Sequence, residues 1–198
     1  MEIRRRTAAV LLAALLLAGP AAHGHSVDHE LVQGNITGLG HIGGDFGFID
    51  DDGQLRRLSD FRGAPVLLFF GFANCPDVCP GFLAKASAVR RELGDAGAAL
   101  PVIFVTVDPA RDDRERLRRY LALFGDGFVG ARVPDGELAE VMRQYAVAAQ
   151  RVRDEDGKIV ITHGSGAYLI DAAGGTAAYI STTRSVAEIA AQVAALLQ

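Results

Sequence analysis

The sequence predicts an α/β protein in which a central mixed sheet is flanked by helices. Three observations favour this class. Two apolar runs, at residues 65–72 and 102–107, are typical of strands buried on both faces of a sheet. Each run is followed by a helical pattern, which is clearly amphipathic at residues 112–124. The chain then closes with a hairpin pattern and a helix, and this succession of elements indicates a mixed rather than a purely parallel sheet.

The composition is that of one ordinary folded domain. The chain has 198 residues, 49% of them apolar, and a formal net charge of −4. This length suits a single domain, and the lack of a basic excess argues against a nucleic-acid binder. Two cysteines, Cys75 and Cys79, are too few for a disulfide-stapled mini-protein or a four-cysteine zinc module.

The N-terminus has the pattern of a secretory signal. Three arginines precede an apolar run over residues 8–18, and small residues follow it. Because a membrane helix needs about 20 apolar residues, we expect residues 1–24 to be a signal peptide, with an uncleaved membrane anchor as the alternative. Residues 25–42 are then a flexible leader, and residues 43–198 form the domain. This predicts a periplasmic or otherwise extracytoplasmic protein, tethered to the inner membrane only if the segment is uncleaved.

Each element of the domain has its own local signal. Residues 46–49 and 55–58 flank an Asp-Asp-Gly turn and predict an N-terminal β-hairpin, and residues 59–63 predict a short helical turn before the buried strand at 65–72. The other expected elements, in chain order, are a helix to about Leu93, a strand at 102–107, a helix at 112–124, a strand at 128–131, a helix at 137–145, strands at 148–153 and 159–162, a hairpin of 167–171 and 176–181, and a helix at 185–198.

The two cysteines lie directly after the first buried strand, in Cys75-Pro-Asp-Val-Cys79-Pro80, where a helix is expected to begin. Cysteines four apart at a helix start lie about one turn from each other, and the proline after each one favours either cysteine as the helix cap. Helix N-termini favour thiolate over thiol. Since a thiolate is both a nucleophile for disulfide exchange and a soft metal ligand, the pair can do either job or both.

A plain stabilising disulfide is the simplest alternative for such a pair in an exported protein. It would close a loop of only a few residues, which gives little entropic stabilisation. The pair also follows a buried strand, and open α/β sheets bind their ligands at the carboxyl ends of strands. We therefore interpret Cys75 and Cys79 as a working site; reactive cysteines at the first strand-to-helix junction are the thioredoxin arrangement.

His163 is the candidate third ligand of a metal at this site. It is the only histidine after the leader, and it comes just before the strand expected at 167–171. Two thiolates with one imidazole suit Cu(I) in low coordination. In a thioredoxin-like sheet the loop before that strand faces the cysteine loop, so we expect Cys75, Cys79 and His163 to come together.

With these residues in view, the sequence resembles the Sco/SenC family of thioredoxin-like copper proteins over about residues 40–198. The resemblance implies a copper site, for Cu(I) or Cu(II), held by Cys75, Cys79 and His163, with the cysteines as a redox pair. It also implies a chaperone that delivers copper to the copper A centre of cytochrome c oxidase, or reduces the cysteines of that centre. The partner is then the copper A subunit or another copper or thiol client. The segments that carry the resemblance are residues 43–46, 58–63, 65–72, 75–80, 106–112, 163 and 168–171.

The sequence departs from the family pattern at two places. Thr162 and Gly164 flank His163 where the family commonly has Asp and Ser, so a carboxylate that would orient the histidine is missing. Ala73-Asn74 stands where Thr-His is more familiar. These departures leave the three expected ligands intact.

Two other functions are alternatives. A periplasmic thiol-disulfide oxidoreductase would use the same cysteine pair on client cysteines and bind metal only incidentally. A peroxiredoxin-type peroxidase is disfavoured because Phe72 stands three residues before Cys75, where such an enzyme needs Thr.

Charged residues near the cysteines have simpler interpretations. We expect Asp108 to cap the turn before the helix at 112–124, with a role at the site as the alternative. We expect Asp77 to be solvated and the arginines at 111–119 to form a solvated helix face.

Overall fold

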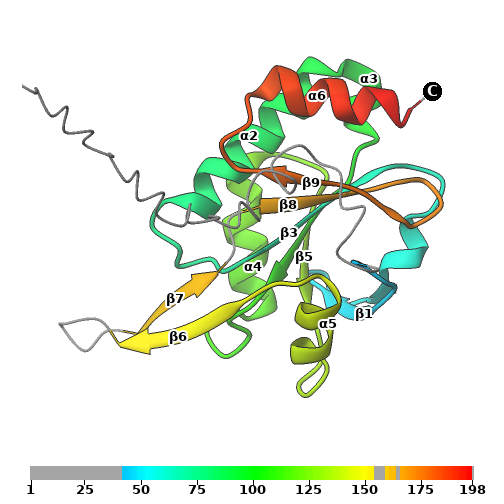
Figure 1. The fold of residues 1–198 in the computed structure, drawn as a ribbon. Helices are drawn as coiled ribbons and strands as arrows, with labels where there is room; N and C mark the ends of the chain where they lie inside the picture. Colours follow the sequence, from blue (N-terminus) through cyan, green and yellow to red (C-terminus); the bar gives the residue numbers. More distant parts are fainter. Residues whose placement is uncertain (1–41, 154–158, 164–165, 198) are drawn as a thin grey trace, which may run out of the picture.

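The computed structural model describes residues 42–153, 159–163 and 166–197, and within them the predicted fold class is confirmed (Figure 1). A seven-stranded mixed sheet has the strand order β2-β1-β5-β4-β3-β8-β9, and a separate two-stranded ribbon pairs β6 with β7. The strands are β1 (Gly47–Asp50), β2 (Leu55–Arg57), β3 (Val66–Gly71), β4 (Val102–Thr106), β5 (Phe128–Arg132), β6 (Ala149–Arg153), β7 (Ile159–His163), β8 (Gly166–Ile170) and β9 (Thr176–Ser181).

The helices cover both faces of this sheet (Figure 1). None of those in the described ranges is long and apolar enough to cross a membrane. The expected signal peptide and nearly all of the leader, residues 1–41, lie outside the described residues. The helices are α2 (Val78–Glu92), α3 (Gly94–Ala98), α4 (Arg114–Leu121), α5 (Leu138–Gln144) and α6 (Val186–Ala195), with short 3-10 turns η1 (Leu58–Phe61) and η2 (Ala122–Phe124).

Strand β3 lies inside the sheet, between β4 and β8, and all six of its residues are buried. Its side chains alternate between two cores, as they must in a strand. Leu67 and Phe69 pack with α2, α4 and α6 on one face, whereas Leu68 and Phe70 pack with α5 and the β1 hairpin on the other. Burying a Leu or Phe side chain contributes roughly 1.5–3 kcal/mol, so the apolar run holds both layers together.

The strand register brings three chain segments to one edge of the sheet. β4 runs parallel to β3 with Gly71 opposite Thr106, so both strands end at the same level. β8 runs antiparallel to β3 with Phe69 opposite Ala167, so β8 begins where β3 ends. The residues after β3, after β4 and before β8 therefore meet at this edge, which we call the carboxyl edge.

The predicted N-terminal hairpin forms. Its turn is closed by the N–H of Gly53, which donates to the carbonyl of Asp50 at 3.0 Å, and Gly53 has a φ of +89° that favours glycine. β1 then pairs antiparallel with β5 and extends the sheet beyond the β3–β4–β5 core.

Two helices differ from their sequence-based expectation. α4 begins at Arg114 rather than at residue 112, because the Asp113 carboxylate accepts the Arg116 N–H at 2.7 Å and caps the helix there. The short helix α3 was not predicted; it begins at Gly94, whose φ of +58° ends the preceding helical path.

Candidate metal centre at the cysteine loop

The cysteine loop, residues 72–77, connects the end of β3 to the start of α2. It opens with a turn in which the Cys75 N–H donates to the carbonyl of Phe72 at 3.1 Å. α2 then begins at Val78, and Asp77 is its N-cap, so the expectation that a cysteine caps the helix is wrong. Pro80 lies in the first turn, where a missing N–H removes no intrahelical hydrogen bond.

The sulfurs of the two cysteines lie beside each other at the start of α2. Both residues are thiols, not joined in a disulfide. The backbone N–H of Cys79 donates to Cys75 Sγ at 3.4 Å, so the sulfur of Cys75 sits against the N-terminal turn of the helix. A donated N–H stabilises negative charge on an acceptor; the sequence predicted this setting for both cysteines, and the structure has it at Cys75.

Cys79 has a different environment, because its side chain is completely buried in the core beneath β3. Burial is the main reason that the pKa of the Cys79 thiol is raised far above its ordinary value of 9.0, and negative charge on Cys75 and Asp112 acts in the same direction. Its thiol is therefore protonated at neutral pH without a metal. Gly71 makes room for this sulfur, since a Cβ added there would lie 2.8 Å from Cys79 Sγ.

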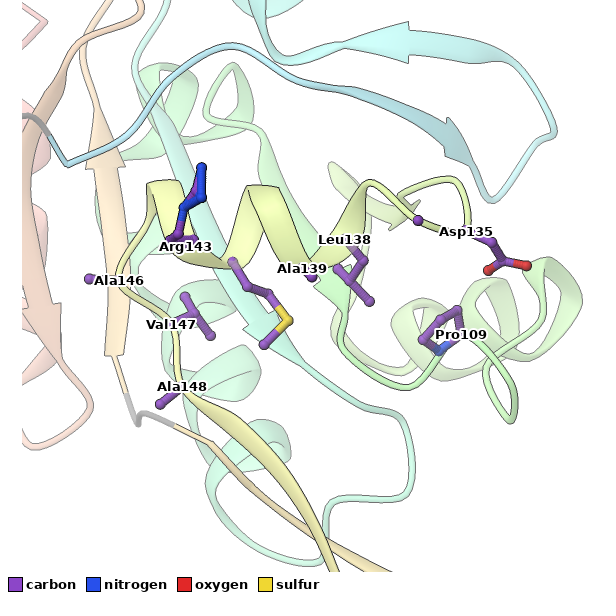
Figure 2. A pocket seen from close by; sticks show the side chains of 10 residues that line it. Pro109, Asp135, Leu138, Ala139, Arg143, Ala146, Val147 and Ala148 are labelled. Atoms are coloured by element: carbon purple, nitrogen blue, oxygen red, sulfur yellow. The ribbon is translucent and has the colours of Figure 1, made fainter.

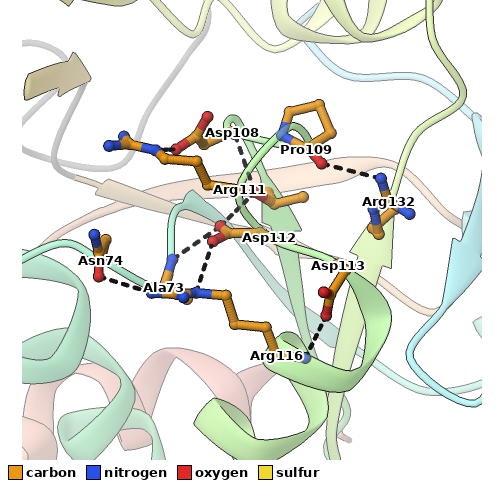
Figure 3. A network of polar contacts seen from close by, with 10 residues as sticks. Ala73, Asn74, Asp108, Pro109, Arg111, Asp112, Asp113, Arg116 and Arg132 are labelled. Atoms are coloured by element: carbon orange, nitrogen blue, oxygen red, sulfur yellow. Dashed lines mark hydrogen bonds and ion pairs between the residues drawn. The ribbon is translucent and has the colours of Figure 1, made fainter. Parts of the chain in front are cut away.

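A buried carboxylate, Asp112, connects the cysteine loop to the neighbouring elements (Figure 3). Its side chain is completely buried. Asp112 Oδ2 accepts the N–H of Ala73 at 2.9 Å and the hydroxyl of Thr106 at 2.7 Å. Burial raises the pKa of the Asp112 carboxyl, while these two hydrogen bonds work against that rise. Thr106 is the last residue of β4, so one carboxylate ties the loop after β3 to the end of β4.

Arg116 adds α4 to this network. Its Nε lies 3.5 Å from Asp112 Oδ1, and its Nη2 donates to Asn74 Oδ1 at 2.7 Å (Figure 3). The expectation that all arginines of this segment form a solvated face is therefore wrong for Arg116.

Asp108 and Asp77 follow their expectations, whereas Arg111 does not, because it is drawn into an ion pair with a buried carboxylate. The backbone carbonyl of Asp108 accepts the N–H groups of Arg111 and Asp112, both at 3.0 Å, which closes the turn before α4. Its buried carboxylate also pairs with Arg111. Asp77 is exposed.

His163 is the last residue of β7, and its backbone lies opposite Ala149 of β6. β8 begins three residues later, at the carboxyl edge. The position of the His163 side chain lies outside the described structure, so its coordination to metal remains a prediction. Among the side chains that are described, no group of three or more His, Cys, Asp or Glu residues forms a metal site.

A groove of about 830 Å³ lies beside α5 (Figure 2). It runs between Pro109 of the loop after β4 and Ala148, the residue before β6, with Met142 and Leu138 of α5 along it. Among the side chains that the structure describes, none lining this groove belongs to a cysteine. We therefore place the chemistry at the cysteine loop rather than in this groove.

Asp112 and Arg116 are the residues that sequence reasoning missed. A signal for them was present, since Thr106 ends an otherwise apolar strand. A polar side chain at such a buried position needs a hydrogen-bond partner. The partner, six residues further on, could be identified only once the loop after β4 was placed.

Comparison with known proteins gives a consistent result. The family model SCO1/SenC matches residues 34–198. The mitochondrial protein SCO2 homolog of Bos taurus is 38% identical over 150 residues, which are 74% of this chain and 56% of that protein. The chain thus spans a little over half the length of this relative.

Solved structures match over most of the described fold. The copper-bound ScoI of Bradyrhizobium japonicum has a TM-score of 0.72 and 34% identity, covering 78% of this chain and 99% of that one. The copper-bound ScoI of Arabidopsis thaliana has a TM-score of 0.73 and 27% identity, covering 79% and 98%. The fold is thus the predicted thioredoxin-like one.

Proposed function

This chain belongs to the SCO1/SenC family, and from that premise we propose that it is a copper chaperone that binds the metal through Cys75, Cys79 and His163. The observation that carries the proposal is the contact between two free cysteines at the carboxyl edge of the sheet, where Cys75 Sγ meets the Cys79 N–H and the two side chains interact. Paired sulfurs are soft donors that suit Cu(I). The copper bound in the two similar solved structures supports the same assignment.

The two cysteines make different contributions in this proposal. Cys75 offers a partly exposed sulfur against the helix N-terminus, where an incoming ion first makes contact. Cys79 offers a buried sulfur whose proton must leave when the ion binds. A bound cation favours that deprotonation strongly. His163 enters from β7, just before β8 begins at the same edge, and supplies an imidazole nitrogen as the third ligand.

The client and the compartment complete the proposal. We infer export by the segment at residues 1–24, a periplasmic domain starting near residue 43, and a role in assembling the copper A centre of cytochrome c oxidase. Copper delivery and reduction of the client cysteines use the same pair of sulfurs. The support for export is the signal-like pattern of residues 1–24.

A Cu(I) titration tests the metal site. The reduced full chain is titrated with Cu(I) against a competing chelator, beside the variants His163→Ala, Cys79→Ser and His41→Ala. We expect one tightly bound ion, and an affinity that falls at least about tenfold in His163→Ala and Cys79→Ser. The matched control His41→Ala removes an imidazole of the leader and should bind like the parent chain.

The second candidate is a thiol-disulfide oxidoreductase. The observation that favours it is the asymmetry of the pair, with Cys75 partly exposed and Cys79 buried. Weak Cu(I) binding that is unchanged in His163→Ala, together with fast turnover on a disulfide substrate, would overturn the chaperone in favour of this enzyme.

A further inference from the structure

We propose that Asp112 is the positioning residue of the cysteine pair, because its buried carboxylate fixes the turn that holds Cys75 against α2. The inference rests on the proposed role of the pair as a working site. It does not depend on which metal the pair binds. Asp112 acts directly on Ala73 and, through Arg116, on Asn74; these are the two residues that precede Cys75.

The hydrogen bonds of the turn divide into internal and external ones. The bond from the Cys75 N–H to the Phe72 carbonyl keeps the turn folded, but it does not fix the turn relative to the sheet. The Ala73 N–H points out of the turn and donates to the Asp112 carboxylate. This bond therefore holds the turn in place above the end of β3.

The carboxylate has two further partners of its own. Asp112 Oδ2 also accepts the Thr106 hydroxyl from the end of β4, and Oδ1 faces Arg116 of α4. A fully buried carboxylate with these partners has little freedom to move. Arg116 extends the same restraint to Asn74 through a second hydrogen bond. β4 and α4 thus both set the position of the residue pair that leads into Cys75.

Loss of this restraint should affect properties that need both sulfurs at once. Cys79 is fixed by α2 and the core whether or not Asp112 is present. Cys75 would keep its place in the chain, but its sulfur would sample more positions relative to Cys79. The effective concentration of one thiol at the other would fall, so disulfide closure and two-sulfur chelation would both weaken.

Two variants and one matched control separate this role from general stability. Asp112→Ala removes all contacts of the carboxylate. Asp112→Asn keeps one oxygen that can accept from Ala73 and Thr106, but its amide cannot pair with Arg116. Asp113→Ala removes the carboxylate of the neighbouring residue, which caps α4 and does not contact the loop.

The first readout is the thiol–disulfide equilibrium of the metal-free full chain in glutathione buffers. Each protein disulfide that forms consumes one glutathione disulfide and releases two glutathione thiols. We expect the equilibrium constant for disulfide formation to fall about tenfold in Asp112→Ala and about threefold in Asp112→Asn. It should stay within about twofold of the parent chain in Asp113→Ala.

The second readout is Cu(I) affinity, which should fall about 10- to 100-fold in Asp112→Ala. Equal shifts in Asp112→Ala and Asp113→Ala would overturn the inference, and so would an unchanged glutathione equilibrium in folded Asp112→Asn. If Asp112→Ala does not fold, Asp112→Asn decides alone. A parent chain that binds no Cu(I) would overturn the proposed function. The glutathione measurements on the same variants would still test the positioning role of Asp112.

Discussion

Cys75 and Cys79 are four positions apart, yet their sulfurs lie in different environments. One is partly exposed at the N-terminal turn of α2, and the other is completely buried in the core. Sequence spacing predicted that the two side chains would be neighbours, and they do interact. It could not predict the difference in burial, because the core that covers Cys79 is built from strands and helices distant in the chain.

Alkylation measures this difference directly. With limiting iodoacetamide at neutral pH, we expect Cys75 to be labelled at least about ten times faster than Cys79, because only an accessible thiolate reacts. Peptide mass mapping gives the site of labelling. In urea both residues should react at comparable rates, and preferential labelling of Cys79 in the native protein would contradict the structure.

Gly71 and Gly81 provide a matched pair of substitutions at opposite sides of Cys79. A Cβ at Gly71 would lie 2.7 Å from the Phe104 ring and 2.8 Å from Cys79 Sγ, whereas a Cβ at Gly81 in α2 meets nothing within 4 Å. We expect Gly71→Ala to lower the free energy of unfolding by about 1–3 kcal/mol through overpacking. Gly81→Ala should raise it by up to about 1 kcal/mol through helix propensity. Urea denaturation checks both, and a neutral Gly71→Ala would show that the sulfur is not confined.

At the scale of elements, capping decides where helices begin. The apolar spacing predicted a helix over residues 112–124. In the structure Asp113 is the N-cap and α4 begins at Arg114. Asp112 therefore lies before the helix, and its carboxylate accepts a hydrogen bond from the cysteine loop. At α6 the signal was unambiguous, because Ser185 and Glu188 form a reciprocal capping box and the helix begins as expected. Where several polar residues compete to be the cap, as at residues 112–113, the sequence alone cannot decide between them.

Asp45 connects two elements, because its side chain links the residues before β1 to η1. Its carboxylate accepts the Ser59 N–H and the Arg57 Nε–H, both at 2.9 Å. Burial alone would raise the pKa of Asp45, but the hydrogen bonds from Ser59 and Arg57 outweigh it and hold the pKa below its ordinary value of 3.8. The negative charge of Asp45 thus contributes to stability.

The pH dependence of this contribution has a definite sign. Because the pKa is depressed on folding, the stabilisation is fully present above the unfolded value, near 3.8, and is lost as the pH falls through the lower folded value. We expect Asp45→Asn to lower the free energy of unfolding by about 1 kcal/mol at pH 7. The gap between the two proteins should close progressively below about pH 4. Urea denaturation across this range measures it, and a gap independent of pH would rule out a charge effect.

At the scale of the whole molecule, the class of fold followed from local patterns but the order of the strands did not. The apolar run at residues 65–72 predicts a strand buried on both faces, whichever strands lie next to it. In contrast, the pairing of Ile49 with Arg132, far apart in the chain, leaves no local signal. The carboxyl edge, and with it the meeting of the cysteine loop with Asp112, depends on such non-local pairing.

Copper binding should stabilise the whole domain, because a ligand that binds only the folded state shifts the unfolding equilibrium. At a free Cu(I) concentration about 100 times Kd, the free energy of unfolding should rise by about 2.7 kcal/mol. For a domain of this size that corresponds to an increase of about 5–10 °C in Tm. Calorimetry measures the shift, and the double variant Cys75→Ser/Cys79→Ser should show none. A similar shift in that variant would mean that the ion binds elsewhere.

The outermost strand β2 has a consequence for behaviour at high concentration. It has only three residues, all exposed, and two of them are Arg56 and Arg57. An open strand edge is a template on which a second sheet can add, and short charged edges resist that addition. On this side of the sheet the domain is therefore protected against edge-to-edge aggregation.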